Sequence, residues 1–288
     1  MEIAIRYRDC AKSVDFAQSS FYNGHKFKYD SSQEEEIMPE SFIGGIGYIL
    51  QEYGMSYLLG AAKTMKIALV GTSIGCLIGL AVGIIRTIPV KKDDRMARKV
   101  FLTAVKAVMA AYVEIFRGTP MMVQAMFLFF GASAVFQINM SIGFAAFFIV
   151  SINTGAYMAE SVRGGINSTD PGQTEGAKAL GMTHVQTMVL VVLPQALRNI
   201  MPQIGNNLII NIKDTCVLSV IGVVELFYTS KGVAGAYYRY FEAFTITMVL
   251  YFVLTFTCSR ILLLIEKRMA GNGSYKMEPQ AAGKGAVL

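Results

Sequence analysis

Two long stretches of the sequence contain no charged side chain, and they constrain the fold more than any other feature. Neither residues 67–85 nor residues 118–159 include Asp, Glu, Lys or Arg. About 20 consecutive apolar residues suffice for a helix to cross the hydrocarbon core of a bilayer. A water-soluble core could not take up two such stretches without leaving large apolar patches exposed. The sequence therefore predicts an all-α protein that crosses the cell membrane, plasma or inner, several times.

Five transmembrane helices are expected. The first covers residues 65–88, the second and third divide the longer uncharged stretch at a turn near residues 137–139, and the fourth and fifth cover residues 202–228 and 242–265. Lys and Arg concentrate in the loop after the first crossing, between the third and fourth, and in the C-terminal tail. Cytoplasmic loops carry an excess of these residues. The C-terminus is therefore expected in the cytoplasm and, with an odd number of crossings, the N-terminus outside.

The other segments are assigned by composition. Residues 1–40 are polar and are expected to form an extracytoplasmic extension. Residues 41–62 are moderately apolar and predict a helix in the outer interface; the alternative is a sixth, weak span that would reverse the N-terminus. Residues 63–268 form the transmembrane domain, with a cytoplasmic loop at residues 160–200, and residues 269–288 are expected to be a flexible cytoplasmic tail.

Composition also excludes some classes of function. The net charge of +6 does not indicate nucleic-acid binding, because the basic residues form no stripe interleaved with stacking aromatics. The two histidines have no partners at metal-ligand spacing, so no metal site is expected. The sequence has no GxxxxGK(S/T) phosphate-binding loop, so the chain is not expected to hydrolyse ATP.

A bend is expected between the amphipathic segment of residues 100–117 and the second crossing. Proline removes a backbone donor and biases the preceding residue away from helix. We therefore predict a structural hinge, at which a helix that follows the cytoplasmic interface turns into the bilayer. The hinge residues are Arg117, Gly118, Thr119 and Pro120.

The connection of residues 160–206 has helical signals of its own. Asp170 and Pro171 are typical of the start of a helix, and a short helix is expected at residues 173–180. Gly181 should end it, because glycine tolerates the left-handed conformation that is common at helix C-termini.

A second helix is expected at residues 183–193, and Pro194 is expected to break it. Two helices around a glycine turn make a compact knob, here defined as residues 170–194. Such a knob is suited to a groove on a soluble partner. The alternative is an amphipathic loop that only connects two spans.

The knob resembles a known signature. Glu175-Gly176-Ala177, three residues, Gly181, nine residues and Val191-Val192-Leu193-Pro194 resemble the EAA loop of ABC importer permeases. The family pattern is Glu-Ala-Ala, three residues, Gly, nine residues and Ile-x-Leu-Pro. Gly176 and Val191 depart from it, while the spacing is kept. Flanking segments resemble the polar amino acid branch, the histidine, glutamine, arginine and cystine permeases: residues 114–120, 163–166, 193–196 and 213–215.

The resemblance implies a fold, partners and a mechanism. The fold would be that of type I, MetI-like permeases, in which two permease subunits, identical or paralogous, enclose a path. Two cytoplasmic ATPase subunits would dock on the EAA loops and use ATP and Mg, and an extracytoplasmic amino acid-binding protein would deliver the substrate. This chain itself would bind no cofactor. The coupling residues would be Glu175, Gly176, Ala177, Gly181 and Pro194.

Polar residues of the fourth crossing are candidates for the substrate path. They are Asn206, Asn207, Asn211, Lys213, Asp214, Thr215 and Glu225. Charged residues in a span are costly and face an aqueous cavity or one another. Lys213 and Asp214 point about 100° apart on a helix, and their charges match the carboxylate and ammonium of an amino acid. The alternative is a buried pair that holds the helix to its neighbours.

Other positions are open to two interpretations. Glu225 lies near the outer end of its crossing and would alternatively meet the binding protein or solvent. Asn153, Tyr157 and Glu160 on the third crossing are further path candidates. Gly71, Gly75, Gly79 and Gly83 recur at every fourth position, which permits close approach of another helix. That helix belongs either to the same bundle or to a second subunit.

Three alternatives compete with an amino acid importer. One is an importer of the same type for another small solute, such as an opine or polyamine. A second is a passive channel or a secondary transporter, although no inverted repeat of the kind common in secondary transporters is apparent. The third is a membrane anchor for a soluble enzyme, which would need no buried Lys-Asp pair.

Overall fold

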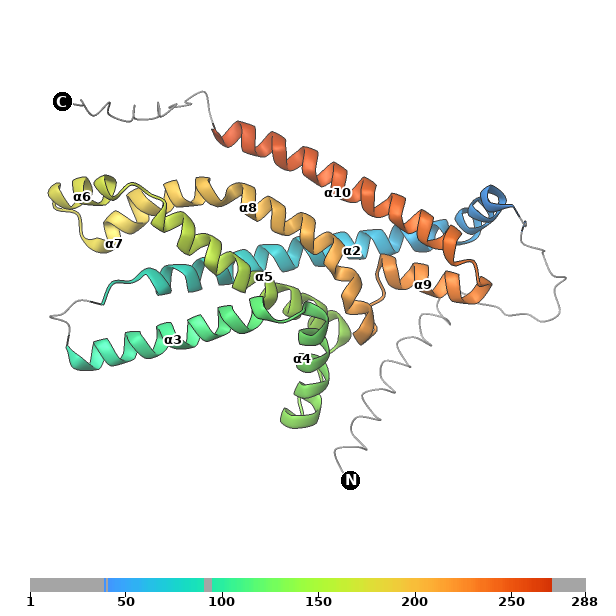
Figure 1. The fold of residues 1–288 in the computed structure, drawn as a ribbon, viewed down its shortest axis with the longest axis horizontal. Helices are drawn as coiled ribbons and strands as arrows, with labels where there is room; N and C mark the ends of the chain where they lie inside the picture. The colour runs from blue at the N-terminus through green and yellow to red at the C-terminus, as the bar shows by residue number, and fades with distance from the viewer. Residues whose placement is uncertain (1–38, 40, 91–94, 271–288) are drawn as a thin grey trace, which may run out of the picture.

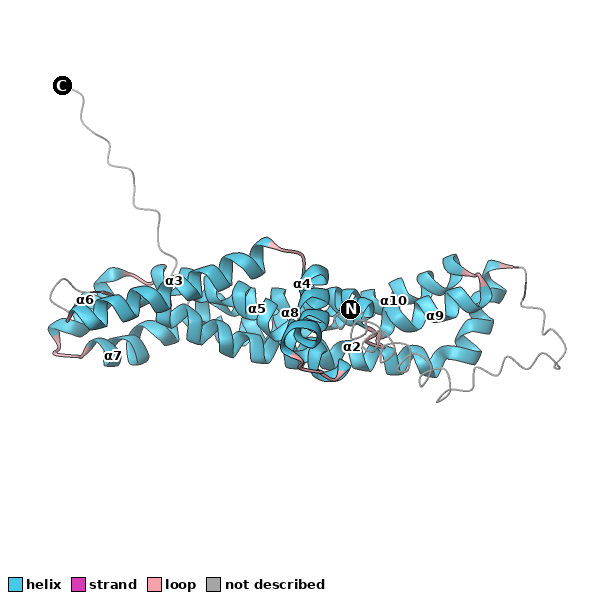
Figure 2. Ribbon diagram, turned by 90° about the horizontal axis from the view of Figure 1, so that it is seen from below, coloured by secondary structure: helices cyan, strands magenta, loops and turns pink. Residues whose placement is uncertain are grey.

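The computed structural model describes residues 39, 41–90 and 95–270, and this part of the chain folds into helices joined by short loops (Figure 1). The order is α2 (Phe42–Thr87), α3 (Met96–Gly118), α4 (Met121–Phe136), α5 (Ile142–Asn167), α6 (Pro171–Ala179), α7 (His184–Thr187), a π-helix (Met188–Val192), α8 (Leu193–Asp214), a 3₁₀ helix (Thr215–Ile221), α9 (Leu226–Tyr237) and α10 (Tyr240–Ala270). No strand occurs among the described residues, so the predicted all-α class is confirmed (Figure 2). The predicted extension and tail lie almost entirely outside the described residues.

Three helices, α2, α5 and α10, are each long and apolar enough to cross a membrane. The number rises to five when each of two bent pairs counts as one crossing: α3 with α4, and residues 184–221 with α9. This upper number equals the five crossings expected from the sequence. Figure 1 places α6 and α7 at one end of an elongated molecule, and α9 with the start of α10 at the other.

The helix α2 is continuous where the sequence predicts two separate helices. It begins after Ser41, whose side-chain oxygen accepts a hydrogen bond from the backbone N–H of Gly44 (3.2 Å), and runs for 46 residues. The separate helix expected at residues 41–62 is therefore absent, because no proline or cap interrupts the run at its end. At about 1.5 Å per residue α2 is about 69 Å long and exceeds the roughly 30 Å hydrocarbon core.

The glycine stripe of α2 lies against α5. A methyl group at Gly71, Gly75 or Gly83 would come within 2.5–2.6 Å of a side-chain carbon of α5. At Gly79 it would lie 2.8 Å from the backbone nitrogen of Ala159. Because α5 occupies the whole stripe, the glycines serve packing within the bundle rather than contact with a second subunit.

The bend predicted at Gly118 and Pro120 is present. The helix α3 ends at Gly118 and α4 begins at Met121, and their axes differ by 116°. The turn expected near residues 137–139 is also present, between α4 and α5, and Gln137 there is left-handed with φ of 58°. The helix α4 is short, at 16 residues or about 24 Å.

The fourth crossing differs at both ends from the helix predicted at residues 202–228. At the knob end the helix begins earlier than predicted, and at the opposite end the predicted single helix is divided in two. From His184 to Asp214 the chain is helical throughout, so Pro194 does not break the helix as expected, and Pro202 lies inside α8. In membrane proteins generally, local π turns and neighbouring helices satisfy the backbone groups that a proline leaves unpaired. At the opposite end Gly222 is left-handed (φ 83°) and ends the 3₁₀ helix, and α9 follows after a bend of 56°.

Two apolar clusters hold the ends of the bundle together. At the knob end α5 packs against the π-helix and α8 through Met158, Val162, Ile166, Val192, Ala196 and Ile200. At the opposite end α2, α9 and α10 meet through Ile49, Tyr57, Ala61, Leu226, Val233, Ala234, Ala243 and Ile246. The middle of α10 is only loosely covered: none of its most apolar 18-residue window is buried, although Leu250, Tyr251 and Leu254 pack against the second cluster.

Candidate functional site

The knob is a helix, a glycine turn and a second helix. The side chain of Asp170 accepts a hydrogen bond from the backbone N–H of Gly172 (2.8 Å) and so caps the start of α6. Gly181 is left-handed with φ of 79°, and its N–H donates to the carbonyl oxygen of Lys178 (2.9 Å). Thr183 then forms a capping box at the start of α7. The turn thus depends on a residue that tolerates positive φ.

The predicted coupling residues differ in exposure. Glu175 and Gly176 are exposed on α6, and a Cβ on Gly176 would have no atom within 4 Å. Ala177 is buried and helps to seat α6 on the rest of the knob. Pro194 is exposed at the start of α8. Four of the five coupling residues, including Gly181, are therefore accessible to another protein.

Exposed apolar side chains surround these residues. Leu180 is 85% exposed, Val185 68% and Leu190 66%. Apolar side chains that cluster on an otherwise polar surface mark a protein contact. Sequence reasoning missed these three residues, although apolar residues in a polar loop are the signal that could have found them.

The knob continues into α8 through the π-helical turn of Met188–Val192. Pro194 follows it and has no N–H to donate, and the side-chain nitrogen of Gln195 donates to the carbonyl oxygen of Val191 (3.0 Å). π-Helical turns occur frequently at functional sites. Because the helical run is unbroken, a movement of the knob also moves α8.

Asn211 joins three helices. Its Nδ2 donates to the hydroxyl oxygens of Thr72 on α2 (2.7 Å) and Thr154 on α5 (2.8 Å). Only 5% of its surface is exposed. Asn207 and Thr215 are also buried and donate within the chain. Asn211, and Asn207 through its contact with Met158 of α5, therefore hold α8 in the bundle.

Asn153 is bound to the hinge. Its Nδ2 donates to the Oε1 of Gln124 (2.9 Å), and the Nε2 of Gln124 donates to the carbonyl oxygens of Phe116 and Thr119 (2.9 Å each). Gln124 therefore closes the turn between α3 and α4. Sequence reasoning missed it, although a glutamine within an apolar run of a long uncharged stretch is an indication of a buried polar contact.

Tyr157 and Glu160 lie toward the exposed side of α5. Tyr157 is 39% exposed, and the guanidinium carbon of Arg117 lies 5.7 Å from its ring centroid, within the range of a cation–π interaction. Glu160 accepts hydrogen bonds from Arg86 on α2 (3.1 Å) and from the Nε of Arg163 (3.1 Å). One carboxylate between two guanidinium groups leaves this cluster with a net positive charge.

Lys213 and Asp214 have no such internal partners. Lys213 is exposed and Asp214 is half-buried at the end of α8. Among the described residues, neither side chain makes a hydrogen bond or an ion pair. The alternative of a buried pair that holds α8 to its neighbours therefore has no support in the structure.

The exposed face of α8 is mostly polar, with Ile210 as an apolar exception. It consists of Asn199, Gln203, Asn206, Ile210 and Lys213, and is called the polar face of α8 below. The exposed side chains of α10 include Met248, Val249, Phe252 and Phe256 and are mostly apolar. Polar groups in a spanning helix face protein or a water-filled cavity rather than lipid. The two helices therefore present surfaces to different surroundings.

Glu225 is fully buried, with 0% exposure. It therefore does not face solvent or a binding protein, which is the alternative expected from the sequence. Its carboxylate accepts hydrogen bonds from the backbone N–H groups of Phe227 (3.0 Å) and Tyr228 (2.8 Å) at the start of α9. It also accepts from the hydroxyls of Thr64 on α2 (3.2 Å) and Tyr251 on α10 (2.9 Å). The sequence placed it at the end of a continuous span, whereas it caps a separate helix.

We expect Glu225→Leu to lower the thermal stability of the protein strongly. Leucine fills the space but leaves four buried or partly buried donors without an acceptor, at a cost of about 1–3 kcal/mol for each donor that finds no water. Glu225→Gln keeps one acceptor oxygen and should cost less. The apparent unfolding midpoint of the two variants in detergent measures the difference, and equal midpoints would show that the carboxylate does not join the three helices.

Comparison with known proteins identifies the type of chain. Residues 96–271 match the family described as binding-protein-dependent transport system inner membrane component. The chain belongs to this family. The match includes the knob and the polar face of α8, and the predicted permease family and MetI-like fold are confirmed. A secondary transporter, a passive channel and a membrane anchor lose their support.

Individual members of this transport family are also similar. The glutamine transport system permease protein GlnP of Escherichia coli (strain K12) is 36% identical over 211 residues, which are 73% of this chain and 91% of the relative. The arginine transport system permease protein ArtQ of Bacillus subtilis (strain 168) is 31% identical over 215 residues, 75% and 93% of the two chains. A crystal structure of an amino acid ABC transporter with histidines superposes with a TM-score of 0.68 at 34% identity, over 80% of this chain and 100% of that one.

Proposed function

We propose that this chain is the multi-pass permease subunit of an ATP-driven importer that carries a polar amino acid across the cell membrane. The observation that carries the proposal is the exposed knob with the EAA spacing, which continues without a break into a helix with a polar exposed face. The similar proteins are named for glutamine and arginine transport. These two amino acids differ in side-chain charge and share the α-ammonium and α-carboxylate groups.

The proposed complex has four further parts. A second permease subunit, identical or paralogous, pairs with this chain, and two ATPase subunits dock on the two knobs and use ATP and Mg. An extracytoplasmic binding protein supplies the amino acid at the opposite end. Leu180, Val185 and Leu190 provide the apolar contact with the ATPase, and Glu175 is exposed on α6 in the same knob.

The proposed mechanism is a two-state movement. When ATP binding closes the two ATPase subunits, their grooves move the knobs. The unbroken helical run from α7 to α8 carries this movement into the bundle, so that the polar faces of α8 in the two permeases change their separation. A ligand at one site thereby biases a bistable element at another.

The proposed path follows the polar face of α8. In this proposal Lys213 faces the carboxylate of the amino acid and Asp214 its ammonium group, since neither side chain makes a hydrogen bond or an ion pair among the described residues. Tyr157 and Glu160 line the path from α5. Asn153, Asn211, Thr215 and Glu225 are withdrawn from it, because they are buried and their polar atoms bond within the chain, whereas Glu160 remains partly exposed beside Arg86 and Arg163.

We expect Asp214→Asn to raise the KM for uptake about tenfold, which corresponds to about 1.4 kcal/mol of lost binding. The amide retains the size of the side chain but not the charge that attracts an ammonium group. Initial uptake rates of radiolabelled amino acid at matched expression measure the effect. Glu52→Gln removes an exposed charge from α2 and should leave KM unchanged. Wild-type kinetics in Asp214→Asn would remove this residue from the path.

Competition between labelled and unlabelled solutes for uptake distinguishes an amino acid importer from an importer of the same type for an opine or a polyamine. An amino acid importer should be inhibited by unlabelled basic or amide amino acids, which have both charged groups. A polyamine has no carboxylate, so its uptake would be insensitive to Lys213→Gln.

A further inference from the structure

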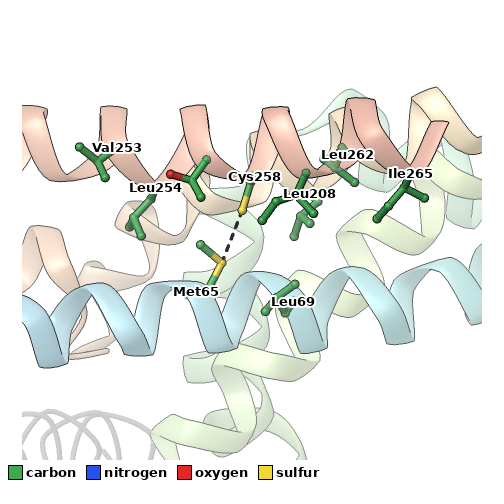
Figure 3. Close-up of a pocket in the computed structure, with 10 residues that line it drawn as sticks. Met65, Leu69, Leu208, Val253, Leu254, Cys258, Leu262 and Ile265 are labelled. Carbon is green, nitrogen blue, oxygen red and sulfur yellow. Dashed lines mark hydrogen bonds between the residues drawn. The ribbon is translucent and has the colours of Figure 1, made fainter. Parts of the chain in front are cut away.

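An apolar groove runs along α10 where this helix stands apart from the rest of the bundle. Its volume is about 460 Å³, and it lies between α10 and residues of α2 and α8. Figure 3 shows Leu254, Leu262 and Ile265 of α10 pointing toward Met65 and Leu69 of α2. Of the ten described side chains that line the groove, only Thr257 carries an oxygen atom. The chemistry of the wall therefore fits a hydrocarbon ligand.

The two ends of the groove differ. At one end Leu254 packs against the buried cluster of α2, α9 and α10, which blocks the groove. At the other end Ile265 is followed by Glu266, Lys267 and Arg268, so two exposed cations and one half-buried carboxylate give the last turns of α10 a net charge of +1. A ligand with an apolar body and an anionic head would place the body in the blind groove and the head beside these two cations.

The length of the groove fits one leaflet of a bilayer. From Val253 to Ile265 the axial distance is about 18 Å at about 1.5 Å per residue. The hydrocarbon core is about 30 Å thick, so one leaflet contributes about 15 Å. A spanning helix of a second subunit would need a contact along the full thickness, whereas a single acyl chain needs only half of it.

We propose that this groove binds an acyl chain of an anionic phospholipid, whose phosphate lies beside Lys267 and Arg268. The blind apolar end, the single-leaflet length and the two cations at the open end all match this ligand. The site is separate from the polar face of α8 and does not depend on which solute the importer carries. Neutral phospholipids share the acyl chain but lack the net charge, so they should bind more weakly.

A single introduced tryptophan can test the proposal, because the chain has none of its own. Ile261 lines the groove and is 51% exposed, so a larger ring fits at its rim. Leu263 is the matched control: it lies at nearly the same depth, about 200° around the helix, and does not line the groove. Full-length Ile261→Trp and Leu263→Trp proteins are reconstituted in phosphatidylcholine vesicles that contain brominated phosphatidylglycerol or brominated phosphatidylcholine with the same chains.

The brominated lipids quench the fluorescence of a nearby tryptophan. For Ile261→Trp, we expect the association constant obtained from this quenching to be about fivefold or more higher for brominated phosphatidylglycerol than for brominated phosphatidylcholine. The reason is the attraction of an anionic headgroup to each nearby basic residue. For Leu263→Trp the ratio should be about one, as for bulk lipid. Adding Lys267→Gln and Arg268→Gln to Ile261→Trp should reduce its ratio to about one while quenching by the chains continues. An equal ratio for both reporters overturns the proposal. Absence of quenching at position 261, as expected if a second copy of the chain fills the groove, overturns it as well.

The unmodified protein provides a second measurement. In native mass spectrometry of the full-length chain in detergent, one added phosphatidylglycerol should stay bound at collision energies that remove phosphatidylcholine. The Lys267→Gln, Arg268→Gln variant should lose this difference. Equal retention of the two lipids by the unmodified chain would contradict the proposed site even if the tryptophan variants failed to fold.

Discussion

Replacing Gly181 by proline should leave the protein in the membrane but uncouple ATP hydrolysis from transport. Proline fixes φ near −65°, whereas Gly181 has φ of 79° and donates its N–H to Lys178. The turn between α6 and α7 would have to open, and the knob would lose the shape that fits an ATPase. Since a coupling free energy of about 1–3 kcal/mol corresponds to a factor of about 5–150, we expect the substrate-stimulated ATPase rate to fall by about tenfold or more.

Gly176→Ala is the matched control for this variant. Gly176 lies in the same knob, but a Cβ there has open space around it, and alanine favours a helix over glycine by about 1 kcal/mol. Although Gly176 is itself a predicted coupling residue, alanine is what the EAA pattern has at this position, so the control should retain full coupling. Unchanged substrate-stimulated ATPase activity in Gly181→Pro, at normal amounts of inserted protein, would show that the knob does not transmit the signal.

Replacing Gly79 by alanine should destabilise the protein. The added methyl group would lie 2.8 Å from the backbone nitrogen of Ala159, and backbone cannot move aside as a flexible side chain can. Overpacking of this kind costs about 1–3 kcal/mol. The apparent thermal midpoint in detergent should fall accordingly, because the contact between α2 and α5 holds the bundle together.

Replacing Gly47 by alanine should instead raise the apparent thermal midpoint. Gly47 is also in α2, but nothing lies within 4 Å of a Cβ there, so Gly47→Ala gains only the helix preference of alanine, about 1 kcal/mol. If both variants shifted the midpoint equally, the close approach of α2 and α5 would not describe the protein.

Features with a local cause could be predicted from the sequence. Asp170 and Gly181 delimit the short helix of the knob, and Gly118 with Pro120 produces the bend before α4. In each case one residue fixes or frees the backbone, so the effect does not depend on distant parts of the chain. The uncharged stretches likewise determine which segments are long apolar helices.

Features that depend on tertiary contacts could not be predicted. Pro194 breaks an isolated helix, but here a π turn that packs on α5 accommodates it. Glu225 is fully buried because α2 and α10 both supply hydroxyl groups to a carboxylate that caps α9. The partners of Asn211 lie in two helices far away in the sequence. Only the packed structure shows which polar residues are engaged and which, such as Lys213, are left exposed.

These contacts divide the bundle by role. The helices α2 and α5 form a rigid pair around the glycine stripe, and Asn211 ties α8 to both of them. The knob and α8 form one continuous helical element that reaches from the exposed apolar contact surface to the polar face. The proposed transport movement therefore requires α8 to shift together with α2 and α5 rather than to slide past them.

The most direct test of the proposed function is uptake into proteoliposomes that contain this permease with its ATPase and binding protein. We predict that radiolabelled glutamine or arginine accumulates against its gradient only when ATP is supplied on the side of the ATPase, and that Gly181→Pro abolishes the accumulation. Uptake at the same rate without ATP or without the ATPase would contradict the account, because it would describe a passive path rather than a coupled importer.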